Sequence, residues 1–150
     1  MKIQILVVAM LIAFTLSACK SNGSQSAGGD GHDHDENLLL TSYNDRFELF
    51  AEASPFAVGK KSDILAHFTW LDNFNPLHDG SITVSLIVGT DGIRQTESRP
   101  FRPGIYKFSL TPDKAGTAVI MFEITTPEGI SQLVTGGLRV YTDVHDAEHA

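Results

Sequence analysis

Two short segments hold most of the side chains that could bind a metal ion. Residues 30–36 (DGHDHDE) contain two histidines and four carboxylates, and residues 145–149 (HDAEH) repeat these residue types. Imidazole and carboxylate suit borderline divalent ions, and flexible spacing favours Cu(II) over Zn(II) or Ni(II) on intrinsic affinity. The alternative is a pair of solvated linkers whose histidines bind nothing. We predict a modest, exchangeable copper or zinc site, with the candidate ligands His32, Asp33, His34, Asp35, His145 and His149.

The sequence evidence for catalysis is weaker than the sequence evidence for metal binding. Residues 145–149 match HxxEH, the inverted zinc-protease motif, in which helical spacing lets both histidines share a metal and the glutamate act as base. That chemistry needs a buried helix and a further ligand, which we do not expect of a terminal segment. The chain contains no GxSxG, GxxxxGK[ST] or GxGxxG motif. We therefore predict that the protein is not an enzyme.

The other candidate ligands have simpler interpretations. A calcium loop starting at Asp33 fails, because Leu38 stands where the motif requires glycine and Asn44 where it requires a bidentate glutamate. His67 lies in an alternating run, which favours a histidine packed on a strand face, and His78 lies in a turn-rich stretch.

Residues 1–18 are predicted to be a lipoprotein signal peptide. Met1 and Lys2 give a positive start, and residues 3–16 form an apolar run that is too short to span a bilayer. Residues 16–19 (LSAC) resemble the bacterial lipobox, in which the cysteine is acylated and becomes the first mature residue. We predict that lipidated Cys19 anchors the chain to a membrane of the cell envelope, on its periplasmic face; the choice between inner and outer membrane stays open.

Composition limits the remaining function classes. The chain has 150 residues, 11 Lys and Arg against 18 Asp and Glu, and a formal net charge of −7. An acidic chain without a basic cluster lacks the electrostatic footprint of a nucleic-acid-binding protein. Its single cysteine excludes an internal disulfide framework, a Cys-rich zinc site and a CxxC redox pair.

The metal-ligand candidates flank one predicted globular domain. Residues 19–37 are rich in Ser, Gly, His and Asp and form a predicted flexible tether, because they contain too little apolar surface to order themselves. Residues 38–141 form the domain, and residues 142–150 form a polar tail.

Residues 38–141 have the periodicity of β-strands. Apolar residues recur at every second position over 47–53, 64–71, 82–88, 106–110 and 118–124, and turn residues separate these runs. A short strand over 93–97 is expected to return from the hairpin signal at Asp91 and Gly92. The stretch 130–141 contains Gly136 and Gly137, which indicates a bulge or a break into two strands. No window has convincing helical periodicity. We predict an all-β, immunoglobulin-like antiparallel sandwich of seven or eight strands, with Trp70 in its core.

Several stretches of this domain resemble a known family. They are residues 43–59 (YNDRFELFAEASPFAVG), 64–76 (ILAHFTWLDNFNP), 84–89 (VSLIVG), 102–107 (RPGIYK) and 110–116 (LTPDKAG). They are similar to the N-terminal extracytoplasmic domain of periplasmic adaptor (membrane-fusion) subunits of heavy-metal RND efflux pumps. A full adaptor would continue into a helical hairpin, a lipoyl-like motif pair and a barrel. Because the chain ends first, we expect it not to bridge a pump to an outer channel.

The resemblance implies a role in metal transport. We predict a lipid-anchored periplasmic accessory domain of a copper- or zinc-type efflux or resistance system, with a divalent ion and RND pump or adaptor components as partners. The alternative is a cell-envelope protein-interaction module with no metal role.

Overall fold

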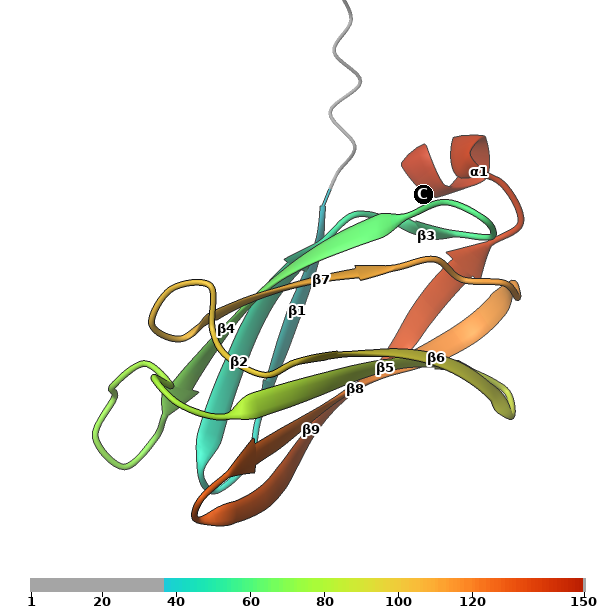
Figure 1. The fold of residues 1–150 in the computed structure, drawn as a ribbon. Coiled ribbons are helices and arrows are strands. Elements are labelled where there is room, and N and C mark those ends of the chain that lie inside the picture. Colours follow the sequence, from blue (N-terminus) through green and yellow to red (C-terminus); the bar gives the residue numbers. More distant parts are fainter. Residues whose placement is uncertain (1–36, 150) are drawn as a thin grey trace, which may run out of the picture. The chain divides into compact units, whose positions relative to one another are not determined.

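The computed structural model describes residues 37–149, which form nine strands and one short helix. Figure 1 shows these elements along the chain. They are β1 (Leu38–Tyr43), β2 (Phe47–Ala53), β3 (Phe56–Ala57), β4 (Ser62–Trp70), β5 (Ser81–Val88), β6 (Asp91–Glu97), β7 (Ile105–Leu110), β8 (Gly116–Thr126), β9 (Gly129–Tyr141) and α1 (Val144–Glu148). Within the described residues, no helix is long and apolar enough to cross a membrane.

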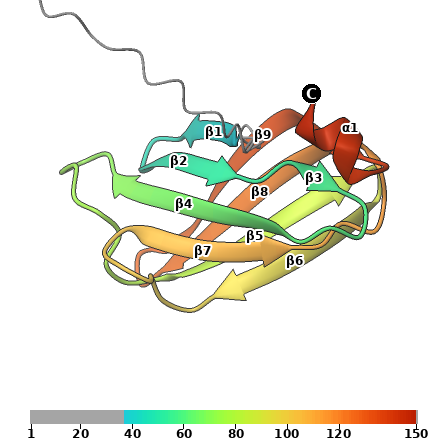
Figure 2. The ribbon, with the colours of Figure 1, turned by 90° about the horizontal axis from the view of Figure 1, so that it is seen from above.

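The strands form two sheets packed face to face, which Figure 2 shows as two layers. One sheet has the order β1-β2-β4-β7 and the other the order β3-β9-β8-β5-β6. Strands β2, β4 and β7 follow the A-B-E order of an immunoglobulin sheet, and β9, β8, β5 and β6 follow the G-F-C-C′ order. The predicted all-β, immunoglobulin-like sandwich is therefore confirmed.

The strand count is nine instead of seven or eight, because the sequence did not reveal β1 and β3. In β1 (LLLTSY) only Leu40 is buried, so the strand lacks a clear period of two and depends on pairing with β2. Strand β3 has two residues and pairs in parallel with the end of β9. This pair is also the exception to the antiparallel pattern.

The alternating residues build one core between the sheets. Strand β5 alternates buried and half-buried positions along its whole length, and β2 buries every second residue. The rings of Phe68, Tyr106, Phe108 and Phe122 meet at the centre. Phe68 lies 5.6 Å from Tyr106 and 5.7 Å from Phe122, centroid to centroid. Such burial is the main favourable contribution to folding.

Strand β9 contains the bulge indicated by its paired glycines. Ala118 of β8 faces Leu138, whereas Ile120 faces Thr135, so β9 has one extra residue at this point. Gly137 lies there with φ of 76°, a left-handed conformation that favours glycine. The two halves of residues 130–141 therefore remain one strand.

Side chains close both lateral sides of the sandwich. The Ser109 backbone N–H of β7 donates to Gln95 Oε1 of β6 at 2.7 Å. On the other side, Ser42 Oγ and Asn44 Nδ2 donate to backbone carbonyl oxygens of β9, each at 3.2 Å. These bonds use backbone groups of β7, an edge strand, and of the part of β9 that β3 does not cover, which would otherwise be available to another chain.

Candidate functional site

The structure describes only part of the predicted metal site. Cys19, the predicted lipidation site, and the ligand candidates His32, Asp33, His34 and Asp35 lie outside the described residues. His145 lies in α1, and His149 is the C-cap residue of this helix.

The tail is helical, although the sequence predicted no helix. The Asp143 carboxylate caps α1 by accepting from the Asp146 N–H at 2.9 Å. Ala147 is 5% exposed, and Glu148 Oε1 lies 2.7 Å from Lys60 Nζ. A one-turn helix is too short to show a periodic pattern in the sequence. It is stabilised by the Asp143 cap, the buried Ala147 methyl group and the ion pair of Glu148.

His145 and His149 lie side by side on α1. Their ring centroids are 4.7 Å apart with an interplanar angle of 63°, and both side chains are exposed. Residues four apart share one face of a helix. Two imidazoles that bind one ion through bonds of about 2.0 Å have centroids about 5 Å apart, so the separation of the two rings matches that of a shared ion.

The pair supplies two ligands. Within residues 37–149, no group of three or more His, Cys, Asp or Glu side chains is placed to hold a metal ion. The Glu148 carboxylate, which would be the base of an HxxEH enzyme, pairs with Lys60. The geometry suits weak capture of an ion more than activation of a water molecule.

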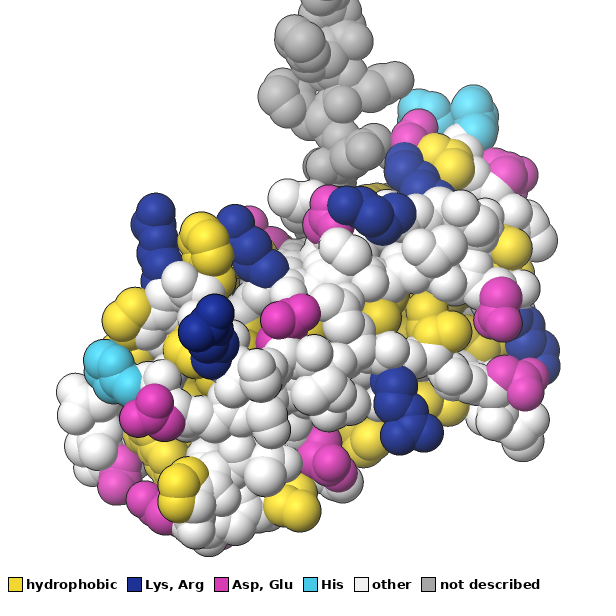
Figure 3. Space-filling model, viewed as in Figure 1, with side chains coloured by type: hydrophobic (Ala, Val, Ile, Leu, Met, Phe, Trp, Pro, Cys, Tyr) yellow, Lys and Arg dark blue, Asp and Glu magenta, His cyan; other side chains and the backbone are white. Residues whose placement is uncertain are grey.

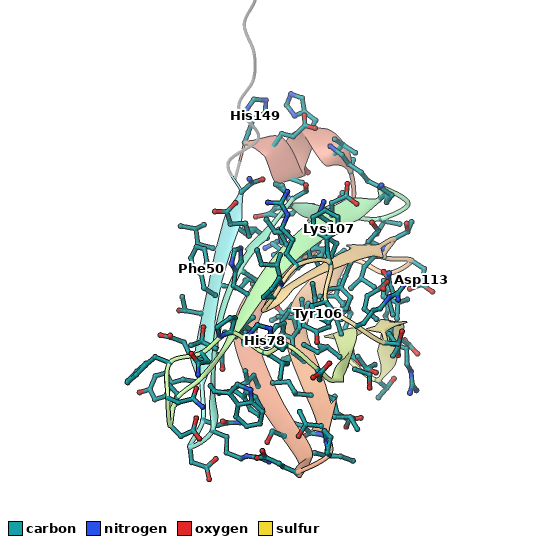
Figure 4. The ribbon with its side chains drawn as sticks, turned by 60° about the vertical axis from the view of Figure 1, so that its left-hand side comes forward. Phe50, His78, Tyr106, Lys107, Asp113 and His149 are labelled. Atoms are coloured by element: carbon teal, nitrogen blue, oxygen red, sulfur yellow. The ribbon has the colours of Figure 1, made fainter. Side chains whose placement is uncertain are left out.

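The other two described histidines lie elsewhere. His67 is half-buried on the outer face of β4, with its ring centroid 6.1 Å from that of Phe50, so it packs on a strand face. His78 is exposed in the β4–β5 loop. Figure 4 shows His78 and His149 far apart, on the loop and on the helix respectively.

Arg46 joins several connections at the end of the sandwich opposite α1. The sequence did not single out this residue. Its guanidinium carbon lies 5.3 Å from the Trp70 ring centroid and 5.4 Å from that of Phe47, and its Nη2 lies 2.8 Å from Glu128 Oε2. Its carbonyl oxygen accepts from the Leu71 N–H at 2.8 Å. One residue thus joins the β1–β2, β4–β5 and β8–β9 connections.

Trp70 lies at the border of the core instead of inside it. It ends the alternation of β4, but it is half-buried, with its ring 4.3 Å from that of Phe47. The prediction of a core position was therefore wrong in degree. The sheet ends here, so β7 does not extend far enough to cover the indole: its first residue, Ile105, pairs with His67.

A groove lies between the β4–β5 loop and the β8–β9 turn. Its volume is about 320 Å³, and two carboxylates, one histidine and two asparagines contribute to its walls. The lining residues are Trp70, Asn73, Asn75, Pro76, His78, Asp79, Thr126, Pro127 and Glu128. The turn-rich sequence of residues 73–80 predicted the loop but gave no sign of the groove.

Phe74, at the tip of the β4–β5 loop, has an unusual backbone. It is the one non-glycine residue within the described range 37–149 with a positive φ, 56°, and its side chain is 76% exposed. A bulky residue in this region of φ/ψ space is a steric outlier. The loop holds an aromatic ring in water at a conformational cost.

The pKa values of Tyr106 and Asp63 are shifted from their ordinary values. Burial, with a smaller effect of the Asp79 carboxylate, raises the pKa of Tyr106 to about 12, and its hydroxyl donates to the Gly80 carbonyl at 2.9 Å. Hydrogen bonds from Ser109 and Lys61 hold the pKa of Asp63 below its ordinary value. Asp63 lines a second groove, of about 430 Å³, on the outer face of the β1-β2-β4-β7 sheet.

Comparison of the chain with protein-family models, curated proteins and solved structures finds no match. The resemblance to efflux-adaptor domains therefore stays a prediction.

Proposed function

We propose that this protein is a lipid-anchored domain of the cell envelope that assists heavy-metal efflux or resistance by capturing Cu(II) or Zn(II). One observation carries the metal assignment: the His145 and His149 rings lie 4.7 Å apart on an exposed helical turn. The pair is a binding element, not a catalytic one, because Glu148 is engaged by Lys60.

The remaining parts of this proposal rest on the sequence. The lipobox supports anchoring through Cys19, and the resemblance to adaptor domains supports a pump or its adaptor as the partner. His32, Asp33, His34 and Asp35 are further candidate metal ligands on the evidence of the sequence. Two to four mixed ligands at flexible spacing give a modest, exchangeable site.

Calorimetric titration of the full chain with Cu(II) and Zn(II) tests the metal site. The double variant His145→Ala/His149→Ala should lose most binding at about pH 7.5, and deletion of residues 30–36 should weaken it. The matched control His67→Ala/His78→Ala should bind like the parent protein. Binding should weaken from about pH 7.5 to about pH 5.5, because a protonated imidazole has no lone pair to donate. Unchanged binding by the double variant would refute the assignment to α1.

A second candidate function is a protein-interaction module of the cell envelope. The exposed Phe74 beside the groove of the β4–β5 loop favours it.

A further inference from the structure

We infer that the loop end of the sandwich binds a basic, apolar segment of a partner protein. In this interaction Phe74 makes the hydrophobic contact, and the groove beside it takes a Lys or Arg side chain. We call Phe74 and the residues that line this groove the distal surface. The inference rests on the second candidate function, the interaction module, and does not depend on metal binding.

Phe74 is presented to the solvent by a well-defined loop. The Phe74 N–H donates to the Trp70 carbonyl at 2.9 Å, and the Trp70 N–H donates to the Asn75 carbonyl at 2.9 Å. The Asn75 N–H also donates to Asn73 Oδ1 at 2.9 Å. Strained backbone persists where surrounding bonds fix it, and such positions concentrate at binding sites. A preformed aromatic contact loses little conformational entropy on binding.

The groove beside Phe74 is acidic. Its ionisable lining residues are His78, Asp79 and Glu128. Glu128 pairs with Arg46, whereas Asp79 forms no ion pair with any residue in the described part of the chain. Figure 3 shows Asp and Glu side chains beside hydrophobic ones at this end, towards the lower left. Arg46 neutralises Glu128, so the Asp79 carboxylate is the charge that attracts a cation.

The charge of this surface favours a partner protein over a lipid bilayer, because its carboxylates repel anionic lipid. A second copy of the chain docked head to head would bring the same carboxylates together.

Trp70 gives a direct signal for the test, because it lines the groove and is the only tryptophan of the chain. The full chain is titrated with a short synthetic peptide of alternating Arg and Leu, and Trp70 emission is recorded. Two matched peptides replace every Arg by Glu or every Leu by Ser. We expect saturable binding of the Arg–Leu peptide only.

Two variants with matched controls locate the binding. Phe74→Ser should raise the dissociation constant at least fivefold, as loss of an interface anchor does, and Asp79→Asn should raise it about two- to fivefold. Phe101→Ser and Asp113→Asn remove an exposed phenylalanine and an exposed carboxylate from other loops and should change it less than twofold. His145→Ala/His149→Ala should leave peptide binding unchanged. A failure of the peptide-binding inference can therefore be distinguished from a failure of the metal-binding proposal.

Several results would overturn the inference. They are no effect of the Arg–Leu peptide on Trp70 emission, equal binding of the Glu–Leu peptide, and equal losses in Phe74→Ser and Phe101→Ser. Binding of phosphatidylglycerol vesicles through Phe74 in place of the peptide would assign the surface to a membrane. Self-association in sedimentation experiments that Phe74→Ser abolishes would assign it to a second copy of the chain.

Discussion

Replacement of Phe74 by glycine and by alanine measures the strain stored in the β4–β5 loop. Both substitutions remove the ring, which is 76% exposed and contributes little burial. They differ in the backbone, because alanine keeps the penalty of the left-handed conformation and glycine does not. The difference in unfolding free energy between the two variants therefore equals the strain at φ of 56° less the extra backbone entropy that glycine loses on folding.

The expected magnitude follows from two opposing effects. A left-handed conformation costs an L-residue about 1 to 2 kcal/mol, and glycine loses about 0.5 to 1 kcal/mol more backbone entropy on folding than alanine. We expect Phe74→Gly to be more stable than Phe74→Ala by up to about 1.5 kcal/mol, with a central value of about 0.75 kcal/mol, which corresponds to a melting temperature roughly 3 to 5 °C higher.

Phe101 is the matched control, because it is also an exposed phenylalanine in a connection and has no positive φ. Here the order should reverse, with Phe101→Ala more stable than Phe101→Gly by about 0.5 to 1 kcal/mol. Urea unfolding followed by Trp70 emission gives all four values. If glycine is less stable than alanine by the same amount at both positions, the loop stores no strain at Phe74 and the reasoning is wrong.

Three further predictions concern the core border, the pH dependence and the anchor. Trp70→Ala should cost about 2 kcal/mol in thermal unfolding followed by circular dichroism, less than the roughly 3 to 5 kcal/mol of a fully buried aromatic, so the variant should fold; a loss near 5 kcal/mol would place the indole in the core. The pKa of Tyr106 is raised to about 12 in the folded protein, so the protonated Tyr106 hydroxyl stabilises the fold fully below pH 10, and this stabilisation is lost as the pH rises from 10 to 12. Urea unfolding should show this decline in the parent protein and not in the variant Tyr106→Phe. Cys19→Ser should leave the membrane fraction after a carbonate wash and keep its melting temperature; retention in the membrane would count against lipidation.

The sandwich could be predicted because its long strands carry their own signal. In β5 the alternation of Ile82, Val84, Leu86 and Val88 matches the burial of every second residue, and this pattern does not depend on the neighbouring strands. Strand β3 has no such signal, since two residues cannot show a period and its parallel pairing with β9 arises only in the folded chain.

The candidate sites could be predicted only where residue type alone indicates chemistry. The spacing of His145 and His149 predicted a shared metal, but their presentation on a docked turn depends on Lys60, which lies 88 positions before Glu148 in the chain. The distal surface left no trace in the sequence. A phenylalanine with positive φ and a tryptophan left partly uncovered at the end of β4 both result from tertiary packing, which local patterns do not encode.

The two proposed sites differ in how firmly the fold supports them. Helix α1 is one turn long and is held by the Asp143 cap, buried Ala147 and the ion pair of Glu148, contacts that are each worth about 1 kcal/mol or less. Opening of this turn separates the two histidines, so metal affinity includes the free energy of keeping α1 docked. The loop end, in contrast, is joined to both sheets through Arg46 and the border of the core. An ion on α1 should therefore exchange readily, while the distal surface keeps its shape before any partner arrives.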